Sequence, residues 1–79
     1  MKVIKLNNKY RLGRLGYNYA FRFPSGADSN YYKVARMVSE AEGWRWDHTF
    51  IGKPDRYGRR IAYVGFRNES VATLVQLQL

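Results

Sequence analysis

Alternating aromatic residues between positions 17 and 23 constrain the fold of this chain more than any other feature. They are Tyr17, Tyr19, Phe21 and Phe23, each separated from the next by one smaller or polar residue. Because successive side chains of a strand point to opposite faces, this spacing predicts a strand with one buried face. A chain of 79 residues has room for one small core. The aromatic face must therefore be covered by other parts of the same domain.

The segment after this strand predicts the helix that covers it. Asp28 or Ser29 is a suitable N-cap, and Gly43 is a natural C-terminal stop. From residue 29 to residue 42, apolar residues recur at helical spacing at Tyr31, Val34, Ala35, Val38 and Ala41. We therefore expect one main amphipathic helix directly after the aromatic strand.

Three later segments are predicted as strands. Residues 44–51 alternate, with Trp44, Trp46, His48 and Phe50 on one face. Residues 60–67 form the next strand after a basic turn at 52–58, and residues 74–79 alternate again. Residues 68–70 have the composition of a helix start, which leaves room for a very short helix before the last strand.

In front of these elements, residues 2–6 and 9–12 predict a hairpin around the turn Asn7–Asn8. The chain is thus expected to be a single domain, with an N-terminal hairpin extension at 1–16 and a core at 17–79. The order strand, helix, strand, strand, short helix, strand predicts an α+β fold, the ferredoxin-like split βαβ sandwich. In this sandwich, one main helix and one short helix cover one face of an antiparallel sheet.

The charge of the chain favours an electronegative partner. Fourteen Lys and Arg residues oppose six Asp and Glu residues, which gives a net charge of +8. Such a balance attracts polyanions and releases their counterions on binding. The absence of cysteine excludes disulfides and thiolate chemistry and favours a reducing compartment. Neither a signal peptide nor a membrane helix is indicated, so we expect a cytoplasmic protein, located in the host cytoplasm if it is viral.

The most basic segment lies directly before a strand and is part of the expected binding site. Its cations and its aromatic ring are Lys53, Arg56, Tyr57, Arg59 and Arg60. Guanidinium groups bind phosphates bidentately and stack on bases. This turn therefore predicts contacts to a nucleic acid.

The rest of the expected site is the sheet face that the helices leave open. Strand alternation directs the aromatic sets of 17–23 and 44–50 to the helices, together with Ala62, Val64 and Phe66. The outward positions then include Thr49, Ile51, Gln76 and Gln78, and those expected to contact the ligand are Arg22, Arg45, Tyr63 and Arg67. Tyr63 is expected to stack on a base, and the three arginines are expected to line its path.

Residues 59–66 partly resemble the first ribonucleoprotein signature of RNA-recognition motifs. The positions that agree are Arg59, Ala62, Tyr63, Val64 and Phe66. Arg60 and Ile61 stand where that family has glycine and an aromatic residue. The match covers under a quarter of the chain, and the strand at 17–23 does not give the family's second signature. The resemblance therefore does not identify the chain as a member.

The sequence offers no catalytic or metal-binding constellation. His48 is the only histidine, and Asp47 beside it points to the opposite face of the expected strand. Glu40 and Glu42 lie about 200° apart around their helix, so they do not form a carboxylate pair. We therefore expect neither an enzyme nor a bound metal or cofactor.

The leading hypothesis is a small nucleic-acid-binding module that uses the basic turn and the open sheet face, with RNA and DNA both possible. The main alternative is a phage or mobile-element protein that inhibits a host protein, for example a nuclease, in an anti-CRISPR-like role. An acidic protein surface would suit the basic turn, and a sheet edge could pair with a strand of the partner. In a third hypothesis, a second copy covers the open face, so both a monomer and a homodimer are considered.

Overall fold

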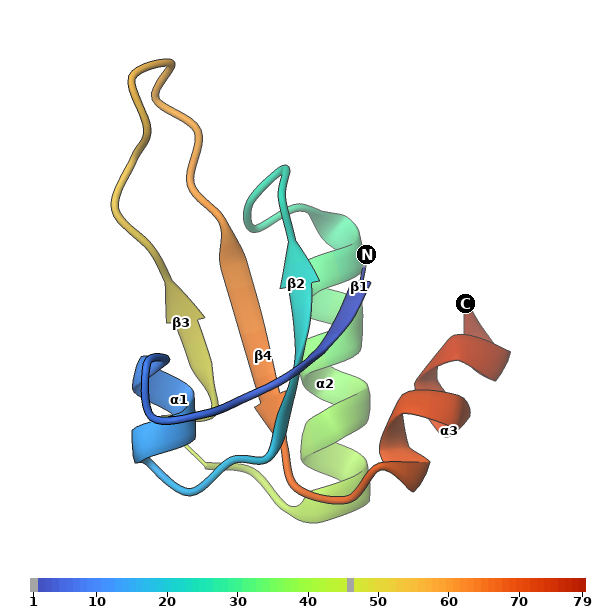
Figure 1. The fold of residues 1–79 in the computed structure, drawn as a ribbon. Coiled ribbons are helices and arrows are strands. Elements are labelled where there is room, and N and C mark those ends of the chain that lie inside the picture. The colour runs from blue at the N-terminus through green and yellow to red at the C-terminus, as the bar shows by residue number, and fades with distance from the viewer. Residues whose placement is uncertain (1, 46) are drawn as a thin grey trace.

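The computed structural model describes residues 2–45 and 47–79. Within these residues the chain forms a small α+β domain with a four-stranded antiparallel sheet and three helices. In chain order the elements are β1 (Lys2–Lys5), α1 (Arg11–Arg14), β2 (Tyr19–Phe23), α2 (Ser29–Glu42), β3 (Thr49–Ile51), β4 (Ala62–Phe66) and α3 (Ser70–Gln78). Figure 1 shows α1 and α2 on opposite sides of the sheet.

The strand order across the sheet is β1–β2–β4–β3, and every neighbouring pair is antiparallel. β2 and β3 therefore run parallel on either side of β4, and α2 lies in the connection between them. Helices α2 and α3 pack on one face of the sheet, and α1 covers part of the other face. The main core lies on the side of α2 and α3.

Helix α2 agrees with the prediction at both ends. The Asp28 side chain accepts a hydrogen bond from Tyr31 N at 3.0 Å, as an N-cap does. Gly43 ends the helix with a φ of 87°, a conformation that favours glycine. The buried residues Tyr31, Val34 and Val38 face the sheet, so α2 covers the aromatic face as expected.

The core between α2, α3 and the sheet contains stacked aromatic rings. Phe21 and Phe66 are fully buried, with ring centroids 4.7 Å apart, and Tyr19 stacks on Phe66 at 5.6 Å. Phe21 lies opposite Val64 in the register, which confirms the helix-facing positions predicted for these two strands. Full burial of a side chain of this size contributes about 1.5–3 kcal/mol, a large amount for a domain this small.

The predicted N-terminal hairpin is wrong. Strand β1 pairs with β2, and residues 9–12 form no strand. The Asn7 side chain accepts a hydrogen bond from Lys9 N at 2.9 Å, and the Asn7 carbonyl accepts one from Tyr10 N at 3.1 Å. Because these local bonds start a helical turn, the backbone enters α1 instead of returning as a strand.

The predicted C-terminal strand at 74–79 is also wrong, because the chain forms α3 there. The residues that α3 buries are Val71, Ala72 and Val75. They share one helical face, whereas Leu77, which was expected in a strand, is 81% exposed. Gln76 and Gln78 therefore lie on a helix and not on the open sheet face. A short apolar run fits both periods, and burial of the helical face decides between them.

The strand predicted at 44–51 is shorter than expected, since β3 contains only Thr49–Ile51. Trp44 lies before β3 and is 71% exposed, and Trp46 lies outside the described residues. The chain turns at residues 47–48. Alternation counted from Trp44 therefore does not continue into β3.

The two faces of β3 are reversed relative to the prediction. Phe50 pairs with Tyr63 and lies with it on the side of α1, while Thr49 and Ile51 lie on the side of α2. A shift of one residue in a strand exchanges its faces. Tyr17 was also expected on the side of α2, and it packs on the side of α1 instead. Both changes place further aromatic rings on the face that was predicted to be open.

Candidate nucleic-acid interface

Helix α1 packs on the sheet through Leu12, which is buried next to Tyr17 and Ala20. Gly65 of β4 makes room for this contact. A Cβ atom at Gly65 would lie 3.0 Å from Tyr17 Cγ and 3.3 Å from Leu12 Cδ1. The part of the face near Gly65 is thus closed, whereas Tyr63, two residues along the same strand, remains half-buried.

The loop before α1 lies close against the helix. A Cβ atom at Gly13 would lie 2.0 Å from the Asn7 carbonyl oxygen, so residue 13 must be glycine for this packing. The Arg14 guanidinium donates a hydrogen bond to Asn8 O at 3.0 Å. These contacts fix the position of Tyr10 relative to the sheet.

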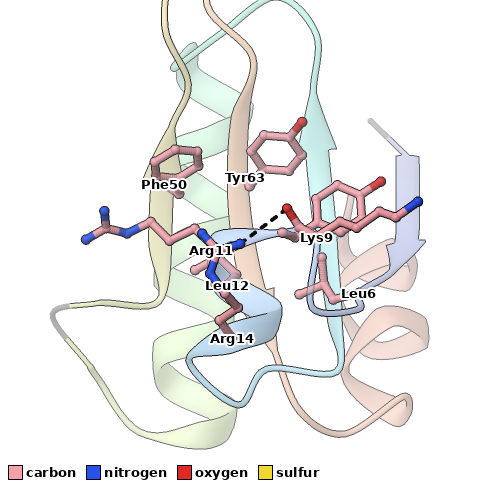
Figure 2. A pocket seen from close by; sticks show the side chains of 8 residues that line it. Leu6, Lys9, Arg11, Leu12, Arg14, Phe50 and Tyr63 are labelled. Atoms are coloured by element: carbon pink, nitrogen blue, oxygen red, sulfur yellow. Dashed lines mark hydrogen bonds between the residues drawn. The ribbon is translucent and has the colours of Figure 1, made fainter.

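Three aromatic rings line the open part of the face. Phe50 and Tyr63 pair across β3 and β4, with ring centroids 6.2 Å apart and 26° between the ring planes. Tyr10 meets Tyr63 edge to face at 6.4 Å. Figure 2 shows Phe50 and Tyr63 side by side above α1. We call the surface lined by Tyr10, Phe50 and Tyr63 the aromatic trough.

The aromatic trough contains two hollows that share Phe50 and Tyr63. The hollow next to α1 has a volume of about 240 Å³, and the hollow next to the loop at 52–61 has a volume of about 390 Å³. The cations on their borders are Lys9, Arg11 and Arg14 at the first hollow, and Lys53 and Arg59 at the second. α1 and the 52–61 loop lie at opposite ends of the sheet (Figure 1), so cations border the aromatic rings at both ends.

The 52–61 loop is organised by Asp55. Its Oδ1 accepts hydrogen bonds from Tyr57 N at 2.8 Å and Arg59 N at 2.9 Å. The bond from the Arg59 backbone is the main reason that the pKa of the Asp55 carboxyl lies below its usual value. The guanidinium carbons of Arg56 and Arg59 lie 5.3 and 5.1 Å from the centre of the Tyr57 ring. The loop therefore displays an aromatic ring between two arginines.

Most of the predicted site residues lie at the aromatic trough or in the adjoining loop. Arg22 is half-buried and lies opposite Tyr63 in the register of β2 and β4. The exposed residues that the loop contributes are Lys53, Arg56, Tyr57, Arg59 and Arg60. Arg59 forms an ion pair with Asp55 at 3.5 Å, in which both side chains remain largely exposed.

Arg45 and Arg67 are not beside Tyr63, where they were predicted. Their guanidinium carbons lie 5.8 and 5.5 Å from the centre of the Tyr17 ring. Arg45 also forms an ion pair with Asp47 at 3.7 Å. The prediction placed Arg45 in a strand that does not form there, and Arg67 follows the end of β4. Both arginines therefore lie close to the buried ring of Tyr17.

Sequence patterns did not predict Lys9, Tyr10, Arg11 and Phe50 as site residues, although all four line the first hollow. The first three were assigned to a hairpin strand, and Phe50 was assigned to the wrong face of β3. One signal was present in the sequence. Residues 9–11 place a tyrosine between two cations, as does the Arg56–Arg59 segment. In the structure, these two segments lie at the two borders of the aromatic trough.

No protein-family model, curated protein or solved structure matches this chain. What the aromatic trough binds is therefore inferred from its own geometry and charge. In the described part of the chain, no helix is long and apolar enough to span a bilayer.

Residues 2–45 and 47–79 contain no candidate metal centre. No three His, Asp or Glu side chains there come together in a way that could hold a metal ion. His48 is buried, its Nδ1 atom has no hydrogen-bond partner, and burial lowers the pKa of its imidazole. Burial therefore favours the neutral form of His48.

Proposed function

We propose that this chain is a small nucleic-acid-binding module whose interface is the aromatic trough together with the 52–61 loop. The observation that carries the proposal is the position of flat rings between two groups of cations. Aromatic rings stack on bases, and Lys and Arg side chains neutralise phosphates. Both kinds of contact lie on one face, so a single strand reaches them together.

The charge balance on this face supports the proposal. Lys9, Arg11 and Lys53 are exposed, and none of them forms an ion pair with a carboxylate in the described part of the chain. Asp55, the carboxylate at the second hollow, is paired with Arg59. The surface therefore presents an excess of positive charge to an approaching phosphate backbone.

The order of the strands supports a more specific description of the fold. We propose that β2, α2, β3 and β4 correspond to the split βαβ part of a ferredoxin-like fold, with β1 as the fourth strand at the edge beside β2, and the strand order β1–β2–β4–β3 supports this. Because β1 pairs with β2, the sheet does not need the C-terminal strand that the sequence predicted. The last segment is then available to form α3.

A protein-binding role is the second candidate, because an apolar surface lies on α3. Leu74 is 45% exposed and Leu77 is 81% exposed. Residues three apart on a helix are neighbours, so the two side chains form one small apolar patch. An inhibitor of a host protein or a homodimer would use this patch, and its binding would depend little on salt.

Fluorescence anisotropy with labelled DNA and RNA, titrated from low to physiological salt, tests the proposed function. The double variant Arg11→Ala with Lys53→Ala removes one cation from each border of the aromatic trough. The matched control, Lys33→Ala with Arg36→Ala, removes the same charge from α2. We expect the first variant to reduce the slope of log affinity against log salt by about one per lost phosphate contact, and the control to leave it unchanged.

Two results would contradict the proposed function at this site. If both variants weaken binding equally, net charge alone attracts the nucleic acid. If the parent protein binds no nucleic acid even at low salt, the chain is not a nucleic-acid-binding module.

A further inference from the structure

The aromatic trough is recessed, and this limits the form of nucleic acid that can use it. Phe50 and Tyr63 are half-buried, whereas Tyr57 in the 52–61 loop is 69% exposed. The residues that border the two hollows come from α1 and from the loop. A ligand must therefore insert a flat group between these borders to reach the rings of Phe50 and Tyr63.

Along a nucleic acid, unpaired bases provide such a group. In a duplex the base faces are covered by neighbouring bases, and only base edges are presented in the grooves. The outer surface of a duplex consists of phosphate and sugar, which offer no flat face on which an aromatic ring can stack. Unpaired bases expose their faces and stack on aromatic side chains or on guanidinium planes.

We infer that the aromatic trough binds unpaired nucleotides, with one base in each of the two hollows that share Phe50 and Tyr63. This inference rests on the proposed function and names its ligand class. The Arg11 guanidinium carbon lies 5.7 Å from the centre of the Phe50 ring, so a cation and a stacking surface occur together at the first hollow. The phosphates of the strand then pass the cations on both borders.

Arg22 extends the same surface toward β2. It lies opposite Tyr63 in the sheet register and is half-buried. A guanidinium group at this position is next to the ring on which we place a base, where it serves either as a phosphate ligand or as a stacking plane. The site therefore combines stacking and phosphate binding on three neighbouring strands.

The first experiment needs only the parent protein. Affinity is measured at physiological salt for unpaired DNA, unpaired RNA, a blunt duplex of the same sequence, and an abasic strand of the same length. The abasic strand keeps the phosphates and lacks the bases. We expect unpaired DNA, unpaired RNA or both to bind on the order of tenfold or more tightly than the duplex and the abasic strand. The two unpaired ligands distinguish DNA from RNA.

A variant then assigns the preference to the aromatic trough. Tyr63→Leu removes the central ring, and Tyr63→Phe keeps it as the matched control. We expect Tyr63→Leu to weaken binding of the unpaired strand on the order of tenfold and to leave binding of the abasic strand unchanged. Circular dichroism and urea unfolding verify that the variant folds. Tyr10→Leu, at a residue that is 38% exposed, replaces it if it does not.

The outcomes separate this inference from the proposed function. Equal affinity for the unpaired, duplex and abasic ligands overturns the inference. The proposed function still stands in that case if Arg11→Ala with Lys53→Ala reduces the salt dependence. Absence of binding to all four ligands at low salt overturns both.

Discussion

Tyr17 connects the segment before β3 to the sheet, and this connection can be measured. Its ring is 3% exposed, and its hydroxyl donates a hydrogen bond to Asp47 Oδ1 at 2.7 Å. Burial, followed by the bond to Asp47, raises the pKa of Tyr17 to about 12 from its usual 10.0. A rise of this size corresponds to roughly 3 kcal/mol in favour of the protonated form in the folded protein.

The sign of the pH dependence follows from where the proton is held. Above pH 10.0 the unfolded chain releases the Tyr17 proton, while the folded protein keeps it up to about pH 12. The contribution of Tyr17 to the free energy of unfolding is therefore complete below pH 10.0 and is lost as the pH rises toward 12. A domain of this size is stabilised by only about 5–15 kcal/mol in total.

The substitution Tyr17→Phe keeps the ring and removes the hydroxyl. A hydrogen bond to a charged acceptor contributes about 1.5–3 kcal/mol, so we expect a loss of that size in urea unfolding at neutral pH. We also expect a smaller further loss at alkaline pH than in the parent. Tyr32→Phe is the matched control, because Tyr32 is 64% exposed. Equal stability of the two variants at neutral pH, with the same alkaline unfolding curve, would refute the role assigned to the Tyr17 hydroxyl.

Two further predictions concern stability. Because burial lowers the pKa of His48 below 6.5, the unfolded chain binds a proton more readily than the folded protein does. The urea midpoint should therefore fall as the pH decreases below 6.5. His48→Leu should reduce this pH dependence, and an unchanged slope of the urea midpoint against pH would contradict the prediction. A Cβ atom at Gly13 would lie 2.0 Å from the Asn7 carbonyl oxygen, so Gly13→Ala should cost more than the roughly 1 kcal/mol of an average substitution. Gly58→Ala is the comparison for Gly13→Ala, since its added Cβ would contact nothing within 4 Å but its φ of 78° is unfavourable for alanine. A loss at Gly13 smaller than the loss at Gly58 would contradict the clash with Asn7.

The parts of the fold that the sequence predicted correctly depend on local signals. Helix α2 has a side-chain cap at Asp28 and a stop at Gly43, and both act within one helical turn. Strand β2 has one aromatic face over its whole length. In both cases the periodicity that indicates the element also identifies the buried face, so one signal predicts the element and its orientation.

The parts that failed depend on partners distant in sequence. Residues 74–79 alternate as a strand would, but Val71 and Val75 bury one side of a helix against the main core. Residues 9–12 do not pair with residues 2–6 as a hairpin, because β1 pairs with β2 instead. No local pattern shows that β1 occupies the edge of the sheet beside β2.

The sequence predicted the border of the candidate site formed by the 52–61 loop and missed the border next to α1. The reason is again that local signals can be read from the sequence and distant contacts cannot. The 52–61 loop has its cations and Tyr57 close together in sequence, so the basic turn was visible. Phe50 reaches the aromatic trough only because the turn at residues 47–48 reverses the faces of β3. Tyr10 reaches it only because residues 11–14 form a helix. Neither event leaves a periodic signal.

The packing of α1 connects the stability of the domain to the proposed interface. Gly65 lets Leu12 and Tyr17 close one part of the sheet face, and this burial holds α1 next to the part that stays open. The same helix carries Arg11 and follows directly after Tyr10, which contacts Tyr63. If the interface depended on net charge alone, the position of α1 would not matter to binding. If the aromatic trough is the interface, any change that displaces α1 must weaken binding without removing a single cation.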